Sequence, residues 1–466
     1  MKKEKQNVEE IPAEETAPDA VEEESAGIPM EFLSEEGFIG KTEISFDPEL
    51  LSGDSAVYNH ELAQFCSQFA MLGYGLMASD AGGAAVSEAG SAESEDGAAP
   101  EPADEEKEDD PQCPEDGSAV APPAQPAAAL EAIGMTDIVT VSDTDIDQVN
   151  YFIARREITV GGKAFVLVFA GFIGSWRGQW YTNFDPGRGS IHKGFADAAD
   201  FAYDGLHRYL EKLGTERDNI KLLLIGHSRG GAVANLLGAR FIRDRIYALP
   251  ENVYTYTFAA PNGVLWMERA QPAYHRIFNI VNNEDFVTKV MPSVWGFGKY
   301  GTTLAFPEKN SGKEWKALLK KVREKMYAFS GYNYKPFPYG RRPSDKVVEA
   351  ITKKIDDTDG FYDTLFRSQG EKVSVQEYFI RTVCRICAEP DGTEESRSGT
   401  MYMLGTFLNR GTSSGELRDI ADFFAIYEGI GSATTRKVSD MYFSYAHLAH
   451  TYCAFMLSIN KEDLIP

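Results

Sequence analysis

Residues 226–230 form a short motif, Gly-His-Ser-Arg-Gly, with a serine between two glycines at the spacing G-x-S-x-G. The motif follows an apolar run, Leu222–Ile225, that suits a buried strand, and it precedes small and apolar residues at helical spacing. A strand-to-helix turn this sharp accepts only glycine beside the serine, and it lifts the Ser228 hydroxyl off the strand end. The next backbone N–H groups then face whatever the hydroxyl attacks. The motif therefore predicts a nucleophilic serine.

A serine hydroxyl is a weak nucleophile at neutral pH, so it needs a general base, and the base needs an orienting acid. The chain has 7 histidines. Enzymes with this kind of turn carry nucleophile, acid and base in that order along the chain. Downstream of Ser228 only His275, His447 and His450 remain. Because His275 precedes the best acid candidate, the order leaves His447 or His450 as the base.

The acid of such a site is expected on a loop just past a strand that follows the nucleophile's strand. Asp285 meets this requirement, because it comes shortly after the apolar stretch Ile277–Val281. Taken alone, Asp285 would be interpreted as a turn residue or a helix cap. Together with Ser228 and a late histidine it is favoured as the acid, and Glu284 is its nearest competitor.

The segments around these residues alternate between strand and helix patterns. Apolar runs indicate strands at 149–159, 164–170, 253–259 and 276–281. Helical spacing indicates helices at 192–212, 313–329, 346–355, 373–387, 420–429 and 442–459. The alternation predicts an α/β fold with a mainly parallel central sheet and helices on both faces. The segment 293–440 fits this scheme least well, and we expect it to be a helical insertion.

Acidic residues are concentrated in the first quarter of the chain. Residues 1–116 hold 31 Asp and Glu against 5 Lys and Arg, whereas the remaining residues hold 40 against 41. No basic patch stands out, so a nucleic-acid partner is not expected. Five cysteines are too few and too irregular for a disulfide framework. Cys384 and Cys387 are interpreted as a structural pair rather than a zinc site, and no metal is expected.

Composition also divides the chain into regions. Residues 1–43 are expected to form a disordered acidic tail and 79–127 a disordered acidic low-complexity insertion, because neither can bury enough apolar surface to become ordered. Between them, 44–78 contains a helical pattern from Asp54 to Tyr74 that should pack on the main domain, 128–466. The first residues lack the apolar run of a signal peptide, and no apolar stretch reaches membrane-spanning length, so we expect a cytoplasmic location.

The loop at 173–191 carries several aromatic residues among glycines and a proline. Trp176, Trp180 and Phe184 are candidates for a lid or for a surface that contacts substrate. Packing of these aromatic side chains into the domain is an equally good interpretation.

The set of motifs, in this order, resembles the class 3 (fungal-type) lipase family of the α/β-hydrolase superfamily, and more closely its bacterial branch. Most of the matching blocks lie within 165–290. They are Val168-Phe-Ala-Gly-Phe172, similar to a strand ending in F-R-G-[ST]; Trp180-Tyr-Thr-Asn-Phe-Asp185, similar to a lid segment; His192-Lys-Gly-Phe195; Gly226–Gly231; Tyr256-Thr-Phe-Ala-Ala-Pro261; and Val281-Asn-Asn-Glu-Asp-Phe-Val287, similar to V-N-x-x-D-x-V. A last block, His447-Leu-Ala-His-Thr-Tyr452, resembles a late histidine followed five residues on by tyrosine.

The resemblance implies an α/β-hydrolase fold and a serine carboxylester hydrolase that acts on acyl esters, lipid esters above all, without a metal or organic cofactor. In this family pattern Ser228 is the nucleophile and Asp285 is the acid. The match to the last block favours His447 over His450 as the base.

The oxyanion hole departs from the family pattern. Ala170 and Phe172 stand where the family usually has Arg and then Thr or Ser, so the resemblance implies a hole made of the backbone N–H groups of Phe172 and Arg229 alone. The distance in sequence from Asp285 to the late histidine is also far longer than in compact fungal lipases, which agrees with a helical insertion.

Two other functions stay open on the sequence. One keeps the chemistry and changes the substrate, as in a thioesterase or an esterase for small acyl groups. The other is a non-catalytic module of the same fold that binds a lipid or a partner protein. The basic helix at 313–329 could touch an anionic membrane surface transiently, although a covering helix with a solvated basic face is the more common arrangement.

Overall fold

The computed structural model describes about half of the chain. The described residues are 27–33, 38–75, 126–142, 144–145, 147–174, 180–183, 190–265, 271–285, 287–289, 297–308, 312–331, 334, 365–368, 371–374 and 446–466. Within them no helix is both long enough and apolar enough to cross a bilayer.

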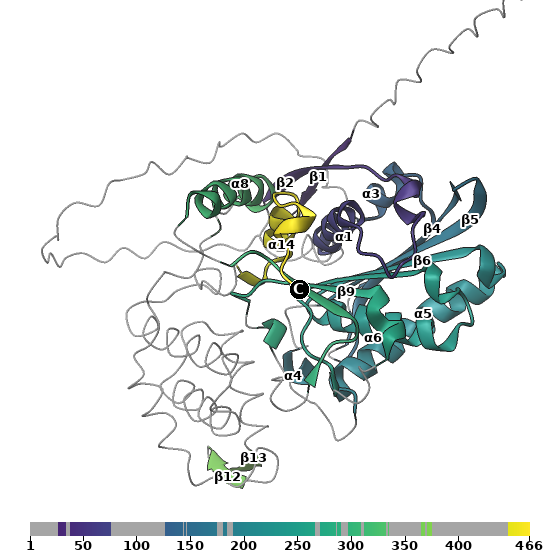
Figure 1. The fold of residues 1–466 in the computed structure, drawn as a ribbon. Coiled ribbons are helices and arrows are strands. Elements are labelled where there is room, and N and C mark those ends of the chain that lie inside the picture. The colour runs from purple at the N-terminus through teal and green to yellow at the C-terminus, as the bar shows by residue number, and fades with distance from the viewer. Residues whose placement is uncertain are drawn as a thin grey trace, which may run out of the picture.

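A seven-stranded mixed sheet forms the centre of the molecule (Figure 1). Its strands, in spatial order, are β11 (Thr302–Ala305), β9 (Ile277–Val281), β7 (Val253–Phe258), β6 (Ile220–His227), β5 (Lys163–Ile173), β4 (Asn150–Val160) and β3 (Thr136–Val141). The strands from β5 to β11 pair in parallel, whereas β3, β4 and β5 pair antiparallel. The predicted mainly parallel sheet is confirmed, and β3 is an edge strand that the apolar pattern missed, because its residues are mostly exposed.

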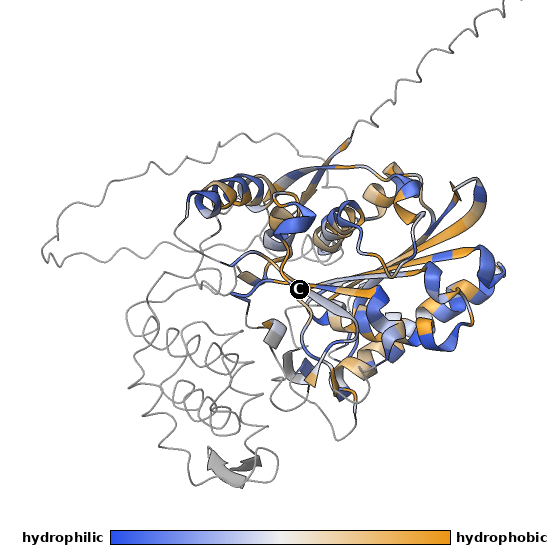
Figure 2. Cartoon of the chain, viewed as in Figure 1, coloured by the Kyte–Doolittle hydropathy of each residue, from blue (hydrophilic) through white to orange (hydrophobic). Residues whose placement is uncertain are grey.

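Helices cover both faces of the sheet, as predicted (Figure 1). One layer consists of α1 (His60–Leu72), α3 (Pro126–Ala132), α8 (Lys313–Ser330) and α14 (Ala449–Met456), and the other of α5 (Lys193–Leu213) and α6 (Arg229–Asp244). Alternate residues of β6 pack into the two layers: Leu223 and Ile225 toward the first, Leu222 and Leu224 toward the second. Figure 2 shows the hydrophobic residues along the strands and on the inner sides of the helices. The result is the α/β-hydrolase fold.

The predicted helix from His192 is confirmed. The imidazole of His192 caps α5 by accepting a hydrogen bond from the backbone N–H of Phe195. Short 3₁₀ helices connect other elements, at Pro48–Leu51, Arg217–Asn219, Pro250–Asn252, Pro272–Arg276, Val287–Lys289 and Lys461–Asp463.

The predicted disordered tail at 1–43 is wrong at its carboxyl end. Strands β1 (Ile28–Leu33) and β2 (Ile39–Ile44) form an antiparallel hairpin. Its apolar side chains enter the core, where Phe32 is 2 % exposed, and Gly40 lies directly against the backbone of α8 at Phe329. The alternation of Ile28, Met30 and Phe32 is a strand signal. The average composition of residues 1–43 is rich in glutamate, so it predicts disorder in spite of this short pattern. Residues 1–26 lie outside the described part.

Helix α1 begins six residues later than predicted. Asp54 accepts a hydrogen bond from the N–H of Ala56 in a turn, whereas Asn59 caps the helix by accepting from Leu62. The helix packs against β5 through Phe65 and Phe69. The acidic insertion predicted at 79–127 lies outside the described residues, except at its end, where α3 begins at Pro126.

The insertion at 293–440 is not purely helical. It contributes β11 to the central sheet, and β10 (Phe297–Gly298) pairs with β8 (Val264–Leu265). A hairpin of β12 (Leu365–Ser368) and β13 (Glu371–Ser374) places the first two residues of the helix predicted at 373–387 in a strand, which corrects that start. The basic helix predicted at 313–329 is confirmed as α8. The helices predicted at 346–355 and 420–429, and Cys384 with Cys387, lie outside the described residues.

The carboxyl-terminal helix predicted at 442–459 is shorter in the structure. Helix α14 covers Ala449–Met456, with Leu448 in an extended conformation at its amino end. Ala446 and His447 are also helical, so the helix breaks at Leu448, directly after His447, and residues 442–445 lie outside the described part.

Candidate active site

The turn from β6 into α6 has the geometry of a nucleophile elbow. Ser228 has φ 57° and ψ −127°, a backbone conformation that few non-glycine residues adopt. A Cβ on Gly226 would lie 2.1 Å from the carbonyl oxygen of Gly230, and a Cβ on Gly230 would lie 1.9 Å from the carbonyl oxygen of Phe172. Only glycine fits at either position, so the two glycines of the motif are required by packing.

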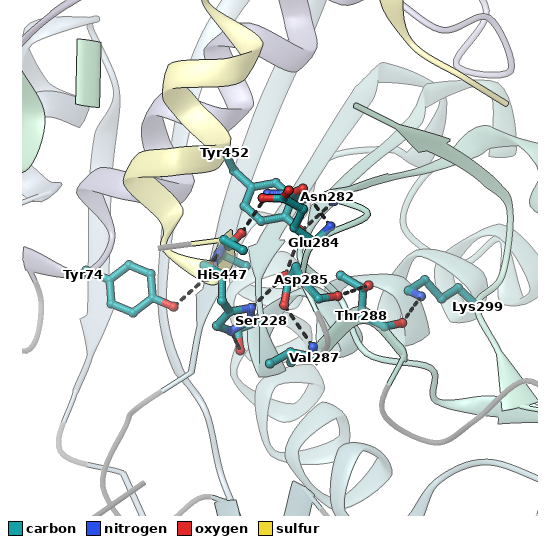
Figure 3. A network of polar contacts seen from close by, with 12 residues as sticks. Tyr74, Ser228, Asn282, Glu284, Asp285, Val287, Thr288, Lys299, His447 and Tyr452 are labelled. Atoms are coloured by element: carbon teal, nitrogen blue, oxygen red, sulfur yellow. Dashed lines mark hydrogen bonds and ion pairs between the residues drawn. The ribbon is translucent and has the colours of Figure 1, made fainter. Parts of the chain in front are cut away.

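The structure brings Ser228, His447 and Asp285 together (Figure 3). The Nε2 atom of His447 lies 2.9 Å from Oγ of Ser228, and its Nδ1 atom lies 2.9 Å from Oδ2 of Asp285. The side chains of His447 and Asp285 are buried. Because an ionised carboxylate only accepts hydrogen bonds, the proton of a neutral His447 belongs on Nδ1, which leaves Nε2 free to accept the proton of Ser228.

Further donors hold Asp285 in place. The backbone N–H of Val287 donates to its Oδ1 at 2.9 Å, and the hydroxyl of Tyr452 donates to its Oδ2 at 2.8 Å. The Tyr452 oxygen in turn accepts the backbone N–H of Asn282 at 2.9 Å. Burial, together with the charge of Asp285, raises the pKa of Tyr452 well above its usual value, so the hydroxyl stays protonated and can donate. The sequence contained Tyr452 as part of a motif, but nothing local indicated its partner.

The competing residues lie elsewhere. The ring of His450 stacks on Phe32 with ring centroids 6.1 Å apart, and its buried Nε2 has no hydrogen-bond partner among the described residues. Glu284 accepts a hydrogen bond from Tyr334. His275 belongs to the 3₁₀ helix that precedes β9, and therefore lies at the opposite end of the sheet from the elbow. The geometry thus selects His447 and Asp285 among the residues that the sequence left open.

His227, the residue before the serine, contacts the backbone of His447. Its Nε2 lies 2.8 Å from the carbonyl oxygen of His447, and its Nδ1 lies 2.7 Å from the hydroxyl of Tyr74. The argument from chain order considers only histidines that follow Ser228, so it leaves His227 out. A role toward His447 could not be predicted, since it depends on two residues far away in the chain.

The two predicted oxyanion donors differ in their surroundings. Arg229 is the first residue of α6, as an oxyanion amide of an elbow should be. Phe172 lies within β5, opposite Tyr151 on one side and Gly226 on the other. Its carbonyl contacts Gly230 of the elbow, and the residue after the strand, Gly174, approaches the elbow as well, because a Cβ on it would lie 3.5 Å from the backbone nitrogen of Arg229.

The F-R-G-[ST] pattern therefore fits a second position in this chain, three residues after the first. Phe172-Ile-Gly174-Ser175 has the same spacing, with glycine at the close approach to Arg229 and serine after it. Ser175 itself lies outside the described residues. The spacing of phenylalanine, glycine and serine at 172–175 is visible in the sequence. The match at 169–172 comes first in the chain and was used in its place.

The side chain of Arg229 connects three segments around the elbow. Its guanidinium donates to the carbonyl of Gln148 at 2.9 Å, to Oδ1 of Asn183 at 2.6 Å and to the carbonyl of Gly194 at 3.0 Å. Burial lowers the pKa of Arg229 to about 10, so the side chain remains charged at neutral pH. Asn183 belongs to α4 (Trp180–Asn183), within the loop predicted as a lid. Trp176, Phe184 and the side chain of Trp180 lie outside the described residues.

Among the described residues, no group of three or more His, Cys, Asp or Glu side chains could hold a metal ion. The contacts of Ser228, His447 and Asp285 would allow nucleophilic attack by Ser228 with His447 as the base, and proton transfer through a neutral imidazole oriented by Asp285.

Comparison with known proteins shows that part of this chain is similar to a known family. The model of the family "Lipase (class 3)" matches residues 171–295. A secreted mono- and diacylglycerol lipase of Fusarium solani is 24% identical over 152 residues, which cover 31% of this chain and 42% of that protein. This chain therefore spans less than half the length of that relative.

Two solved lipase structures are also similar over part of their length. A propeptide complex of Rhizomucor miehei lipase is 22% identical, with a TM-score of 0.29, over 37% of this chain and 56% of that one. The lipase of Rhizopus microsporus var. chinensis is 22% identical, with a TM-score of 0.30, over 40% and 66%. These scores are too low to support an argument, and the bacterial branch stays a prediction. The segment matched by the family model contains both the elbow and Asp285, and over this segment the chain is similar to the class 3 lipase family.

Proposed function

We propose that the protein is a serine carboxylester hydrolase that cleaves acyl esters, with Ser228 as nucleophile, His447 as base and Asp285 as acid. The observation that supports this most directly is the unbroken chain of contacts from Ser228 Oγ through both ring nitrogens of His447 to Asp285. Three groups from distant parts of the sequence meet at hydrogen-bond distance in the order that acyl transfer needs.

The reaction would take place in two halves. Ser228 Oγ attacks the ester carbonyl while His447 Nε2 takes the hydroxyl proton, and the same nitrogen then gives that proton to the leaving alcohol. Water attacks the acyl-enzyme by the same route and releases the acid. Asp285 keeps the Nδ1 proton in place and stabilises the imidazolium in both halves. The Arg229 amide is the first oxyanion donor, and the backbone near Phe172 and Gly174 is the region that would supply a second.

The proposed substrates are lipid esters, because the family is named for lipases and the matched Fusarium protein is described as acting on mono- and diacylglycerols. Thioesters and small soluble acyl esters are the alternatives within the same chemistry. The cytoplasmic location predicted from the sequence also stays a proposal, and the matched relative is described as secreted.

The test is hydrolysis of p-nitrophenyl esters from acetate to palmitate by the full chain, with Ser228→Ala and His447→Ala as variants and His450→Ala as the matched control. We expect activity that rises with chain length, is lost in the first two variants and persists in the control. If His450→Ala loses ester hydrolysis and His447→Ala retains it, His450 is the base instead of His447. No hydrolysis of any ester, together with no labelling of Ser228 by a fluorophosphonate, would favour the non-catalytic binding module.

We further propose that the exposed face of α8 contacts an anionic lipid surface. The helix carries six Lys or Arg residues against two Glu, all partly or fully exposed. Trp315, Val322, Met326 and Phe329 anchor its other face in the core. Two exposed aromatic residues, Phe38 at 37% and Tyr327 at 44%, lie beside the carboxyl end of the helix, where Phe38 contacts Gly331. A basic helix face flanked by exposed aromatic side chains is typical of surfaces that bind anionic lipids.

Vesicle sedimentation tests the surface. The chain should bind vesicles of phosphatidylcholine with added phosphatidylglycerol and release them in high salt. The double variant Lys316→Glu/Lys320→Glu should lose this binding. The exposed pair Lys212→Glu/Arg217→Glu, in the last turn of α5 and in the 3₁₀ helix after it, should retain it. Equal binding by both double variants would argue against the α8 surface.

A further inference from the structure

Two hydrogen bonds connect the end of α1 to the backbone of His447. Tyr74 lies 2.7 Å from Nδ1 of His227, and Nε2 of His227 lies 2.8 Å from the carbonyl oxygen of His447 (Figure 3 shows Tyr74 and His447). Burial lowers the pKa of His227 well below its usual value, so the ring is neutral. A carbonyl can only accept, so the single ring proton lies on Nε2, and Nδ1 must accept the proton of the Tyr74 hydroxyl. The direction of both bonds is thereby fixed.

Helix α1 also holds the other end of α14. The side chain of Gln64 donates to the carbonyl of Met456 at 2.9 Å, and Nε2 of His60 lies 2.9 Å from the carbonyl oxygen of Ile459. These carbonyls are at the carboxyl end of α14, where helical partners are missing. The two helices lie side by side (Figure 1) and run antiparallel, since Tyr74 acts at the amino end of α14 and His60 at its carboxyl end.

His447 needs such support because of its position. It is the last residue of a helical segment, because Leu448 after it is extended and the helix breaks there. A carbonyl group at such a break lacks the N–H group that a continuing helix would supply. The imidazole must nevertheless satisfy Ser228 and Asp285 at once, each at 2.9 Å. A hydrogen bond to its carbonyl oxygen from His227, which adjoins the nucleophile, fixes the two residues relative to each other.

We propose that Tyr74, acting through His227, is a positioning residue for His447, so that the amino-terminal helix α1 forms part of the hydrolase's catalytic machinery. The inference rests on the proposed function and goes beyond it, because Tyr74 lies well before residues 171–295, where the family match is found. The alternative is that Tyr74 only fills space, since its ring packs edge-on against His227 with centroids 5.5 Å apart.

The Tyr74→Phe variant separates the two roles, because it keeps the ring and removes the hydroxyl. We expect kcat to fall about tenfold, since displacing a catalytic group by about 1 Å can lower the rate by up to about 100-fold. KM should stay within about twofold, because no substrate contact is lost. The matched control is Tyr247→Phe, whose hydroxyl contacts Nδ1 of His207 on α5, in the other layer of helices. It should keep the wild-type kcat.

His227 provides the second measurement. In His227→Gln the side-chain amide can still donate to the carbonyl of His447, and this variant should keep most of the activity that His227→Leu loses. In the Leu background, Tyr74→Phe should cause no further loss, because its effect passes through His227. Losses that multiply in the double variant, or a wild-type kcat for Tyr74→Phe, would overturn the proposal.

The assay keeps this inference distinct from the proposed function. If the unaltered chain hydrolyses no ester and its Ser228 is not labelled by a fluorophosphonate, the proposed function is overturned and the positioning role with it. If the unaltered chain is active and Tyr74→Phe behaves like Tyr247→Phe, only the positioning role is overturned. Circular dichroism melting of each variant verifies that the rates are measured on folded protein.

Discussion

The hydroxyl of Tyr452 lies 2.8 Å from Oδ2 of Asp285, the same oxygen that contacts Nδ1 of His447. Tyr452 reaches it from the second turn of α14, the helix that directly follows His447. The short segment from His447 to Tyr452 therefore contains both the proposed base and a residue that donates a hydrogen bond to Asp285. A small shift of α14 would move both groups together and preserve their relation to Asp285 better than if they came from separate elements.

Removing this hydroxyl should weaken turnover without abolishing it. In Tyr452→Phe, Asp285 loses a donor and the N–H of Asn282 loses its buried acceptor. Hydrogen bonds to charged groups contribute about 1.5–3 kcal/mol, so kcat should fall at least about tenfold and the free energy of unfolding by about 1–3 kcal/mol. Ester hydrolysis and urea denaturation measure the two effects. Unchanged kcat with reduced stability would make Tyr452 a purely structural residue.

Asp285→Asn should leave the fold intact and lower kcat by about 10⁴-fold. The amide would favour the wrong tautomer of His447 and could not stabilise the imidazolium. Glu284→Gln is the matched control, because Glu284 is adjacent and contacts Tyr334, and it should keep most of the activity. If the two variants lose activity equally, Asp285 is not the acid of this site.

Arg229→Lys should destabilise the protein more than its conservative character suggests. A single ammonium cannot replace a planar guanidinium that bonds Gln148, Asn183 and Gly194 at once. Unsatisfied buried acceptors cost about 1–3 kcal/mol each, so we expect a loss of about 2–4 kcal/mol in urea denaturation.

Arg240→Lys on the same helix provides the comparison for Arg229. Arg240 forms an ion pair with Asp200 at 2.8 Å, at a partly exposed site. Its replacement should cost less than about 1 kcal/mol. Similar losses in the two variants would show that the buried contacts of Arg229 contribute little.

Ser175→Ala tests whether the oxyanion hole uses a side chain. If the match at Phe172-Ile-Gly174-Ser175 is the relevant one, the hydroxyl would supply a donor, and its loss should lower kcat by about 10²-fold. KM should change little, because the donor acts mainly on the developing oxyanion. Wild-type kcat in this variant would support the backbone-only hole that the first match predicted.

Stability should fall as the pH drops below about 6.5. Burial lowers the pKa of His450 to about 4, and burial, with a smaller effect of the Arg229 charge, lowers that of His192 to about 3. Between these values and 6.5 the unfolded chain binds more protons than the folded one. Each histidine therefore removes about 1.4 kcal/mol per pH unit as the pH falls.

Urea midpoints from pH 7.5 to pH 4.5 would measure this slope, in roughly the range where the linkage acts. His450→Phe, which keeps an aromatic ring against Phe32, should make the dependence shallower by about the contribution of one histidine. An unchanged slope in this variant would show that His450 does not titrate in the way its burial implies.

The proximity of Ser228, Asp285 and His447 could be predicted because each of them has a local signature and a place in the chain order. Ser228 lies in a motif of five residues, and Asp285 follows a strand closely. His447 was selected by order and a short pattern, although 219 positions separate it from the serine. A single sequence does not show which residues are close in space. The order of nucleophile, acid and base along the chain supplied that information here.

What surrounds the triad could not be predicted, because it consists of long-range pairs without local patterns. Tyr74 and His227 are 153 positions apart, and neither has a sequence context that indicates the other. The side chain of Arg229 meets three partners that share no motif. The hairpin at Ile28–Ile44 had a strand pattern, yet it was missed because composition was averaged over a long acidic stretch.

The elbow also has a consequence for the evolution of this chain. Ser228 adopts a conformation that glycine would accept with less strain. The residue that chemistry requires is therefore not the one that stability favours, and the rest of the domain must compensate for the difference. A lineage that lost the reaction and kept only binding would be free to replace this serine with glycine. The identity of residue 228 in relatives of this protein is thus a record of whether selection still acts on turnover.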